Sequence, residues 1–375
     1  MFFFCKDKTN VSELNNQTYI STENMLPNRA GITTATTLPT GELTPSFEID
    51  DTLVSNIRPY FKKIWKATFS GGCSADVLVF KAKENISKDY LYYVLADDEF
   101  FKYSMATSKG TKMPRGDKTS IMNYPVKLPP LPTQQKIAAI LSSLDDKIEL
   151  NNKINTNLEQ QAQALFKNWF VDKYEKEGTI GDYCAVKSGF AFKSAWWQDE
   201  GTKVIRIGDI EQGCLNLETC AHVATDKIEV AKDFIVQGGD LVIAMTGATI
   251  GKFSMIPKTQ EPILVNQRVG KFFLGNNPIE KVPFIYCTLK QEEVITKFIN
   301  RGQGSAQPNI STSDIISIPC WIQNQESISR FNKSVQPMFE TIISNQEENQ
   351  NLSNIRSSLL PKLMSGEIDV DSVQL

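Results

Sequence analysis

The sequence predicts an α+β fold in which two α/β domains are separated by two long helices that pair as an antiparallel coiled coil. Three observations support this prediction. A Gly-x-x-x-Pro loop occurs twice, at residues 110–114 and 304–308, about 194 residues apart. Short β-rich runs and an apolar helical pattern precede each loop, and a long helical pattern without glycine follows each one. A unit that is used twice indicates two similar surfaces for two similar targets.

The first half, residues 1–130, is predicted to form a mixed domain. A helix is expected from Asp89 to Tyr103, because apolar side chains recur there at three- and four-residue spacing. The proline-rich segment 126–132 after the loop is predicted to be extended. Strands bounded by turn residues are expected at 19–21, 53–57 and 77–80.

The second half, residues 178–322, repeats this pattern. The glycine cluster at 246–251 lacks the third glycine and the acidic partner of a dinucleotide-binding motif, so it is predicted to form a tight turn between two strands. The repeated elements are expected as strands at 204–207 and 239–244, a helix at 284–299 and a loop at 302–309.

The first long helix is predicted within boundaries 131–172, with an uninterrupted pattern from Thr133 to Phe170. Thr133 is expected to cap its start. Apolar positions recur at close to 3.5 residues, which predicts a coiled-coil seam in which Asn151 fixes the register at some cost in stability. The predicted seam contains Ile137, Ile140 or Leu141, Leu144, Ile148, Asn151, Ile154 or Asn155, Leu158, Gln161 or Ala162, Leu165 and Trp169.

The second long helix is predicted within boundaries 323–366, from about 325 to 364. Pro337 is expected to kink this helix or to place its true start slightly later. Asn345 and Asn349 lie on its seam and are interpreted as register devices. Because an exposed apolar seam is costly in water, the two helices are predicted to pack on each other. The alternative is that each helix packs on its own domain.

Composition excludes several classes of protein. The net charge of −3 and a pI of about 5.6 argue against a general nucleic-acid binder. No apolar run approaches the ~20 residues of a membrane helix, so no membrane partner is expected. The seven cysteines are scattered and form no C-x-x-C pair, which favours reduced thiols in the cytoplasm over disulfides or zinc. His222 has no metal-ligand spacing around it, and no catalytic motif is present.

Positive charge is concentrated in two segments. Residues 58–66 contain four cations, no acids and several aromatic side chains, and residues 109–118 contain four cations with one acid. Basic stripes of this kind suit contact with phosphate. The alternative interpretation of each segment is a solvated face.

These features together resemble the specificity subunit of a Type I restriction–modification system. The motifs that carry the resemblance span nearly the whole chain: Tyr19–Pro27, Ser55–Lys63, Gly110–Arg115, Leu131–Leu141, Ala164–Phe170, Lys187–Lys193 and Val204–Ile210. The resemblance implies two target-recognition domains, each reading one half of a split, asymmetric sequence in double-stranded DNA, with the helices as a ruler for the spacer. It also implies two methyltransferase subunits and two restriction/translocase subunits as partners. S-adenosylmethionine, ATP and Mg²⁺ then belong to those partners, and this chain is expected to be non-catalytic and without cofactors.

Candidate DNA-binding side chains follow from both the residues and the resemblance. For the first loop they are Lys109, Lys112, Arg115 and Lys118, which suit phosphate or guanine. For the second loop they are Arg301, Gln303, Ser305, Gln307 and Asn309, of which the amides suit adenine edges. Phosphate positioning is expected from Arg58, Tyr60, Lys62 and Lys63, and Arg268 is a weaker candidate. The alternative is that the loops only form turns.

Two other functions stay open. A truncated or decoy subunit would act as a protein-interaction scaffold, and an enzyme with cryptic methyltransferase or nuclease motifs would bind S-adenosylmethionine. The second half opens with residues 179–185, for which the first half has no counterpart. The first domain is therefore expected either to lack an edge strand or cap, or to be truncated, with its true start upstream.

Overall fold

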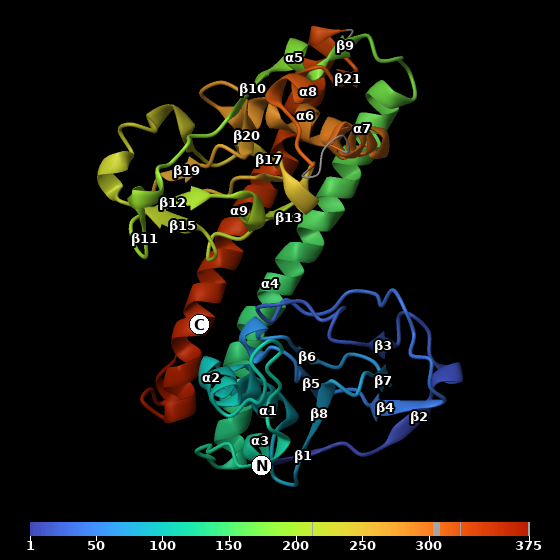
Figure 1. Ribbon diagram of the computed structural model, residues 1–375, viewed down its shortest axis with the longest axis vertical. Coiled ribbons are helices and arrows are strands. Elements are labelled where there is room, and N and C mark those ends of the chain that lie inside the picture. The colour runs from blue at the N-terminus through green and yellow to red at the C-terminus, as the bar shows by residue number, and fades with distance from the viewer. Residues whose placement is uncertain (212, 303–307, 323, 374–375) are drawn as a thin grey trace. The chain divides into compact units, whose positions relative to one another are not determined.

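The computed structural model describes residues 1–211, 213–302, 308–322 and 324–373 (Figure 1). The chain divides into two compact units. Unit 1 consists of Met1–Lys147 and Leu352–Leu375, and unit 2 consists of Ile148–Asn351. Because the two long helices each cross this division, each unit contains a part of both.

Unit 1 contains two four-stranded sheets in its described residues. The first has the order β1-β8-β5-β6 and is antiparallel throughout (Figure 1). The second has the order β2-β4-β7-β3, and its β3–β7 pair is parallel. The strand bounds are β1 Phe2–Phe4, β2 Lys8–Asn10, β3 Tyr19–Ile20, β4 Leu43–Phe47, β5 Thr52–Ser55, β6 Ile64–Lys66, β7 Gly71–Cys73 and β8 Val77–Ala82. The three strands predicted in this half are confirmed as β3, β5 and β8.

The helices of unit 1 correct one prediction. The single helix expected from Asp89 to Tyr103 is two helices, because Asp97 is extended (φ −65°, ψ 143°) and accepts a hydrogen bond from the Glu99 N–H at 3.1 Å. Asp97 therefore ends the first helix and caps the second. The helices are η1 Val11–Glu13, η2 Pro59–Phe61, α1 Lys88–Ala96, α2 Asp98–Ala106, α3 Lys118–Met122 and η10 Val370–Ser372.

Unit 2 repeats this design with a larger second sheet. Its first sheet has the order β10-β20-β17-β18, and its second has the order β11-β15-β12-β19-β16. Short pairs β13–β14 and β9–β21 accompany them. The bounds are β9 Gly178–Thr179, β10 Ala185–Ser188, β11 Trp197–Gln198, β12 Thr202–Ile205, β13 Ile210–Glu211, β14 Cys214–Leu215, β15 Ala221–Val223, β16 Ile235–Val236, β17 Leu241–Ala244, β18 Phe253–Met255, β19 Ile263–Val265, β20 Val269–Phe273 and β21 Pro319–Cys320.

The helices of unit 2 also correct one prediction and confirm another. The helix predicted at 284–299 is again two helices, and the predicted turn at 246–251 is confirmed, with Gly247 and Gly251 at φ values of 74° and 80°. The bounds are α5 Ile180–Tyr183, η4 Ser194–Trp196, η5 Ile207–Asp209, η6 Thr225–Lys227, η7 Lys232–Phe234, η8 Gly247–Thr249, η9 Pro278–Glu280, α6 Val282–Leu289, α7 Glu292–Gly302 and α8 Thr312–Ile316.

The two units share one topology. In the first sheet of unit 1, β1 pairs with β8, and β5 lies between β8 and β6. In the first sheet of unit 2, β10 pairs with β20, and β17 lies between β20 and β18. Strands β1, β8, β5 and β6 thus correspond to β10, β20, β17 and β18. The parallel pair β3–β7 likewise corresponds to β12–β19. The duplication seen in the sequence is therefore a duplication of the fold.

The expected lack of an edge strand in unit 1 is wrong for this sheet. Strand β1 forms the edge next to β8, as β10 does next to β20, with Phe2 opposite Ala82 and Phe4 opposite Phe80. The segment after the second long helix also contributes to unit 1, where Val370 packs with Tyr90 and Ile137.

The long helices are α4, Leu131–Phe166, continued by the π-helix η3, Lys167–Val171, and α9, Gln325–Ser365. Thr133 lies inside α4 rather than at its cap, because the helix begins two residues earlier at Leu131. Pro337 does not delay the start of α9, which begins at Gln325 and is continuous through the proline. No helix in the described residues is long and apolar enough to cross a membrane.

The two long helices run antiparallel within each unit. In unit 1 the Arg356 guanidinium pairs with the Asp145 carboxylate. In unit 2 the Asn151 amide donates to the Asn349 Oδ1 at 2.9 Å, and Asn345 donates to Asn155 at 2.8 Å. The residue number thus falls on one helix as it rises on the other, which confirms the predicted pairing.

The helices also pack on the globular part of their unit, so the two alternatives for their packing are both partly correct. In unit 2 Phe331, Val335 and Phe339 of α9 join the same core as Phe272 of the sheet. The predicted seam is wrong at Leu165, which is exposed, because the buried side chain at that turn is Phe166. Phe166 lies against Phe284, Trp321 and Phe331 with ring centroids 5.6–5.7 Å apart.

Candidate nucleic-acid interface

The Gly-x-x-x-Pro loop of unit 1 is a closed hairpin. Lys109 and Arg115 exchange two backbone hydrogen bonds of 2.9 and 3.0 Å across its base. Gly110 starts the turn at φ 91°, a left-handed conformation that favours glycine. The loop is attached to the segment after β5, because the Arg58 N–H donates to the Pro114 carbonyl at 2.8 Å. The position of the loop is therefore set by the central strand of the sheet.

A cavity of about 540 Å³ lies beside this loop. Its walls come from the ends of β3, β5 and β7, from residues 37–39 and from the tip of the loop. The polar and charged side chains on it are Tyr19, Ser21, Thr22, Glu23, Thr37, Ser55, Arg58, Lys63, Ser74 and Asp76. Donors and acceptors are thus mixed on one concave surface next to the predicted reading loop.

Arg58 is the least satisfied cation on this surface. Its backbone is left-handed at φ 50°, a conformation that is uncommon outside glycine. Its Nε atom is buried and has no hydrogen-bond partner in the described part of the chain. Strained backbone and unsatisfied donors both concentrate at binding sites. The geometry therefore favours Arg58 among the predicted contacts of residues 58–66.

Lys62 and Lys63 have intramolecular partners. The Lys62 ammonium lies 2.9 Å from the Asp98 carboxylate, which also pairs with Arg29. Burial alone favours the neutral acid, but hydrogen bonds from both cations lower the pKa of Asp98. Lys63 donates to the Thr22 carbonyl at 2.6 Å, and burial lowers the pKa of its ammonium. The predicted phosphate contacts of these lysines therefore require the present partners to be exchanged for DNA.

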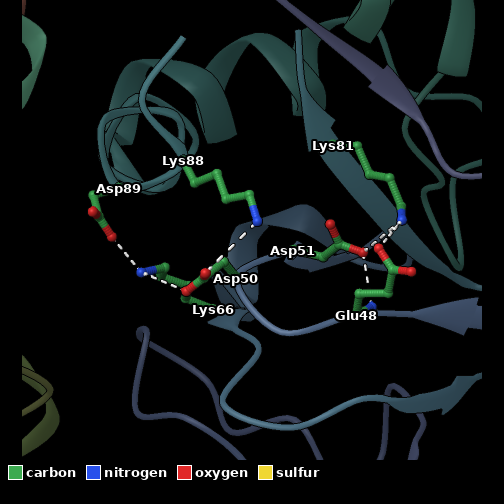
Figure 2. Close-up of polar contacts among 7 residues, drawn as sticks. All are labelled: Glu48, Asp50, Asp51, Lys66, Lys81, Lys88 and Asp89. Carbon is green, nitrogen blue, oxygen red and sulfur yellow. Dashed lines mark hydrogen bonds and ion pairs between the residues drawn. The ribbon is translucent and has the colours of Figure 1, made fainter. Parts of the chain in front are cut away.

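The fourth cation of the segment, Lys66, belongs to a group of ion pairs with Asp50, Lys88 and Asp89 (Figure 2). Its ammonium pairs with Asp89 and lies 3.2 Å from Asp50, which also pairs with Lys88 at 3.7 Å. Burial favours the neutral amine, but hydrogen bonds to both acids outweigh it and raise the pKa of Lys66.

Figure 2 also shows a second, separate group, in which Lys81 lies 2.7 Å from Glu48 and 3.5 Å from Asp51. Burial raises the pKa of the Asp51 carboxyl. The contacts of both groups join residues 48–51 to β6, β8 and α1. These ion pairs therefore hold the segment before β5 against β6, β8 and α1, which is a structural role.

The remaining candidates of unit 1 lie on or near the loop. Tyr60 is exposed and packs against Phe61 with ring centroids 4.7 Å apart. The Lys109 ammonium pairs with Asp117. Lys112 and Lys118 are exposed. These side chains are available to a ligand, and their assignment to DNA stays a prediction.

Arg115 is held by an acid that the sequence did not reveal. Its Nη2 atom lies 3.2 Å from both carboxylate oxygens of Asp76, which is in the turn between β7 and β8. The Arg115 side chain is nevertheless 55% exposed. No sequence motif marks Asp76. Its pairing with Arg115 forms because the β7–β8 turn and the 109–115 loop lie side by side in the folded chain.

Unit 2 has an equivalent surface of different chemistry. Asn309 forms a bridge with Thr246 after β17, as Arg115 does with Ile57 after β5. Both residues line a cavity of about 580 Å³ together with Gln267 and Arg268. The weaker candidate Arg268 is thus placed beside Asn309. The Thr246 hydroxyl is buried and has no partner among the described residues.

Of the other candidates of the second loop, only Arg301 lies within the described residues. Gln303, Ser305 and Gln307 lie outside the described residues. The Arg301 guanidinium donates to the Asp314 carbonyl and to the Ser317 hydroxyl at the end of α8. Its predicted phosphate contact would require this anchoring to change.

The described residues contain no group of three or more histidine, cysteine or acidic side chains that could hold a metal ion. Burial raises the pKa of the Cys73 and Cys184 thiols to about 12, so these thiols are not activated nucleophiles.

Comparison with known proteins gives one consistent result. The family model described as the Type I restriction modification DNA specificity domain matches residues 52–160 and 172–352. The Type I restriction enzyme MjaVIII specificity subunit of Methanocaldococcus jannaschii is 28% identical over 327 residues, which cover 81% of this chain and 76% of that protein. The HindI specificity subunit of Haemophilus influenzae is 25% identical and covers 94% of both chains. The crystal structure of a Type-I restriction-modification system S subunit from M. genitalium matches 96% of both chains with 17% identity and a TM-score of 0.49.

Proposed function

Since this chain belongs to the Type I restriction–modification DNA specificity family, we propose that it reads a split, asymmetric sequence in double-stranded DNA. One half is read by the recognition domain within residues 1–130 and the other by that within 178–322. The spacer helices within 131–172 and 323–366 set the gap between the halves. The single observation that carries the proposal is the duplicated surface, in which Arg115 and Asn309 hold equivalent positions on one topology.

The chemistry of the two surfaces supports different targets. Unit 1 offers arginine and lysine side chains, which suit guanine and phosphate. Unit 2 offers Gln267 and Asn309 beside Arg268, and amides can bond adenine in two places. One scaffold with two diverged surfaces is what an asymmetric target requires.

The partners and cofactors belong to the same proposal. The chain is non-catalytic alone and docks two methyltransferase subunits and two restriction/translocase subunits, in the cytoplasm. S-adenosylmethionine, ATP and Mg²⁺ serve those subunits. This assignment rests on the family.

Genome-wide mapping of methylated adenine tests the proposal. The full chain is co-expressed with a methyltransferase subunit of its own system in a host without adenine methylation. We expect modified adenines in one motif that has two fixed parts and a constant gap. A stable complex that modifies no adenine would refute the proposal and favour the scaffold function. Binding of S-adenosylmethionine by the chain alone would favour an enzyme.

A further inference from the structure

Most cations near the first loop already have a hydrogen-bond or ion-pair partner within unit 1, and such cations are poorer candidates for reading a base. Lys62 pairs with Asp98, Lys63 with a carbonyl, Lys66 with Asp50 and Asp89, and Lys109 with Asp117. Such partners hold their side chains in fixed places, and DNA would have to displace them. Arg115 differs, because its own acid occupies only one end of its guanidinium.

The contact between Arg115 and Asp76 leaves part of the guanidinium available to a ligand. A single nitrogen, Nη2, contacts both carboxylate oxygens at 3.2 Å. Every two-nitrogen donor edge of a guanidinium includes Nη2, which carries two hydrogens. Nη2 forms one hydrogen bond, to Oδ2 of Asp76. Its second hydrogen can therefore act together with the neighbouring nitrogen, and the Arg115 side chain is more than half exposed. A bidentate contact to the O6 and N7 atoms of guanine requires two donors of one guanidinium edge that point the same way.

Asp76 also lowers the entropic cost of a contact between Arg115 and guanine. A free arginine has many rotamers, and fixing one of them on binding costs conformational entropy. An acid that holds the guanidinium before DNA arrives avoids that cost, as positioned functional side chains generally do. The backbone of the loop is fixed as well, through its closed base and the bond from Arg58 to Pro114.

We propose that Asp76 is a positioning residue that aims Arg115 at the guanine of one G·C pair in the half-site read by unit 1. This inference rests on the proposed function and deepens it. Unit 2 has Asn309 at the equivalent place, so the effect of Asp76 is confined to one half of the target. The Arg115–Asp76 ion pair is partly exposed and contributes little to folding stability. A change in DNA reading can therefore be measured without a change in folding.

The test combines methylation mapping with binding to a library of duplexes, using the full chain with its methyltransferase subunit. Three variants are compared with the wild type: Asp76→Asn, Arg115→Lys, which keeps the charge but loses the planar fork, and the control Glu84→Gln. Glu84 is exposed in the turn after β8 and does not line the cavity. Thermal unfolding of each variant shows whether the fold is intact.

We expect both site variants to relax one base-pair position in one half of the motif. Loss of a bidentate contact corresponds to roughly 5- to 150-fold in discrimination. Asp76→Asn should leave the total affinity for DNA unchanged or higher, because it removes a negative charge while Arg115 keeps its own. The control variant Glu84→Gln should methylate the same motif as the wild type, with the same discrimination at each position.

Several outcomes would overturn the inference while leaving the proposed function intact. One is an unchanged motif with unchanged discrimination in Asp76→Asn. Others are a relaxed position that is A·T in the wild-type motif, or equal loss in both halves. A wild-type complex that marks no split motif refutes the proposed function itself. These two kinds of failure are therefore distinguished by the wild-type map.

Discussion

At the scale of single residues, the partners of each cation decide which charges DNA can use. Residues 58–66 contain four cations in the sequence, yet Lys62, Lys63 and Lys66 each have a partner within unit 1. The buried Nε atom of Arg58 forms no hydrogen bond with the described residues, and the side chain lines the cavity beside the loop. A run of positive charge in a sequence therefore overstates the charge that is free for phosphate.

This difference gives a prediction for Arg58 and Lys63. Replacing Arg58 by alanine should weaken DNA binding for all sequences and reduce the slope of log K against log salt by about 1, as expected for one lost phosphate contact. Lys63→Ala serves as the matched variant and should leave the slope unchanged if Lys63 stays bound to Thr22. Titration of a fluorescent duplex at several salt concentrations measures both slopes. A normal slope for Arg58→Ala together with a reduced slope for Lys63→Ala would show that DNA exchanges the partners.

At the scale of elements, the long helices are joined in unit 2 by a ladder of asparagines. Asn151 is 1% exposed and donates to Asn349 at 2.9 Å and to Glu348 at 2.7 Å. Asn349 in turn donates to Asn152 at 2.9 Å. Because each amide matches a specific partner on the other helix, a shift of either helix along its axis would break the ladder. Polar seam positions fix register in this way in other coiled coils.

The ladder predicts the behaviour of leucine substitutions. Asn151→Leu should lower the free energy of unfolding by about 1–3 kcal/mol, since it leaves the partly buried Asn349 acceptor without its donor. The double variant Asn151→Leu with Asn349→Leu should recover part of this loss, because the Asn151–Asn349 pair is removed as a whole. Glu348 and Asn152 still each lose one donor. Urea denaturation measures the changes, with Gln160→Leu on an exposed position of the same helix as the control. A single variant as stable as the wild type would show that the ladder contributes nothing.

Each unit also attaches a long helix through a tyrosine of its globular part. In unit 1 the Tyr93 hydroxyl donates to Asp145 at 2.7 Å, and in unit 2 the Tyr286 hydroxyl donates to Glu159 at 2.7 Å. Both acids lie on α4. Burial is the first cause that raises the pKa of each tyrosine, so both hydroxyls stay protonated donors. The recognition surfaces are thus fixed to the helices by equivalent contacts.

At the scale of the whole molecule, the duplication predicts that the two halves of the target and their gap are independent features. Each reading surface is built within one unit. The helices are the elements that continue from one unit into the other. A change of helix length should therefore alter the gap, while changes on a surface alter one half.

Inserting seven residues into each helix tests this independence. The insertions are placed after Lys147 in α4 and after Asn351 in α9, where the chain divides into its units. Seven residues add about 10 Å of helix and nearly two whole turns, which keeps the faces in register. At 3.4 Å per base pair, we expect the gap in the methylated motif to grow by about three base pairs, with both halves unchanged. An unchanged gap would exclude the helices as the ruler, and insertion in α4 alone should instead destabilise the pairing.

The sequence by itself determined the features that depend on local pattern. The first loop, the duplication, the long helices and the strands β3, β5, β8, β12 and β17 follow from periodicity and turn residues, which act over a few neighbouring positions. It misjudged the helix breaks at Asp97 and near Gln291, where one capping or turn residue outweighs a continuous apolar pattern.

Only the tertiary structure decided which charged side chains are free and which are held. Arg115 meets Asp76 across 39 residues of sequence, and Lys62 meets Asp98 across a comparable interval. Such pairs form because separate turns of the fold bring the side chains within hydrogen-bond distance, and no periodicity in the chain encodes that approach. For the same reason the cavities that contain Arg58 and Arg268 were not visible in the sequence. Local pattern fixes the elements, but the electrostatics of a binding surface depends on distances between elements.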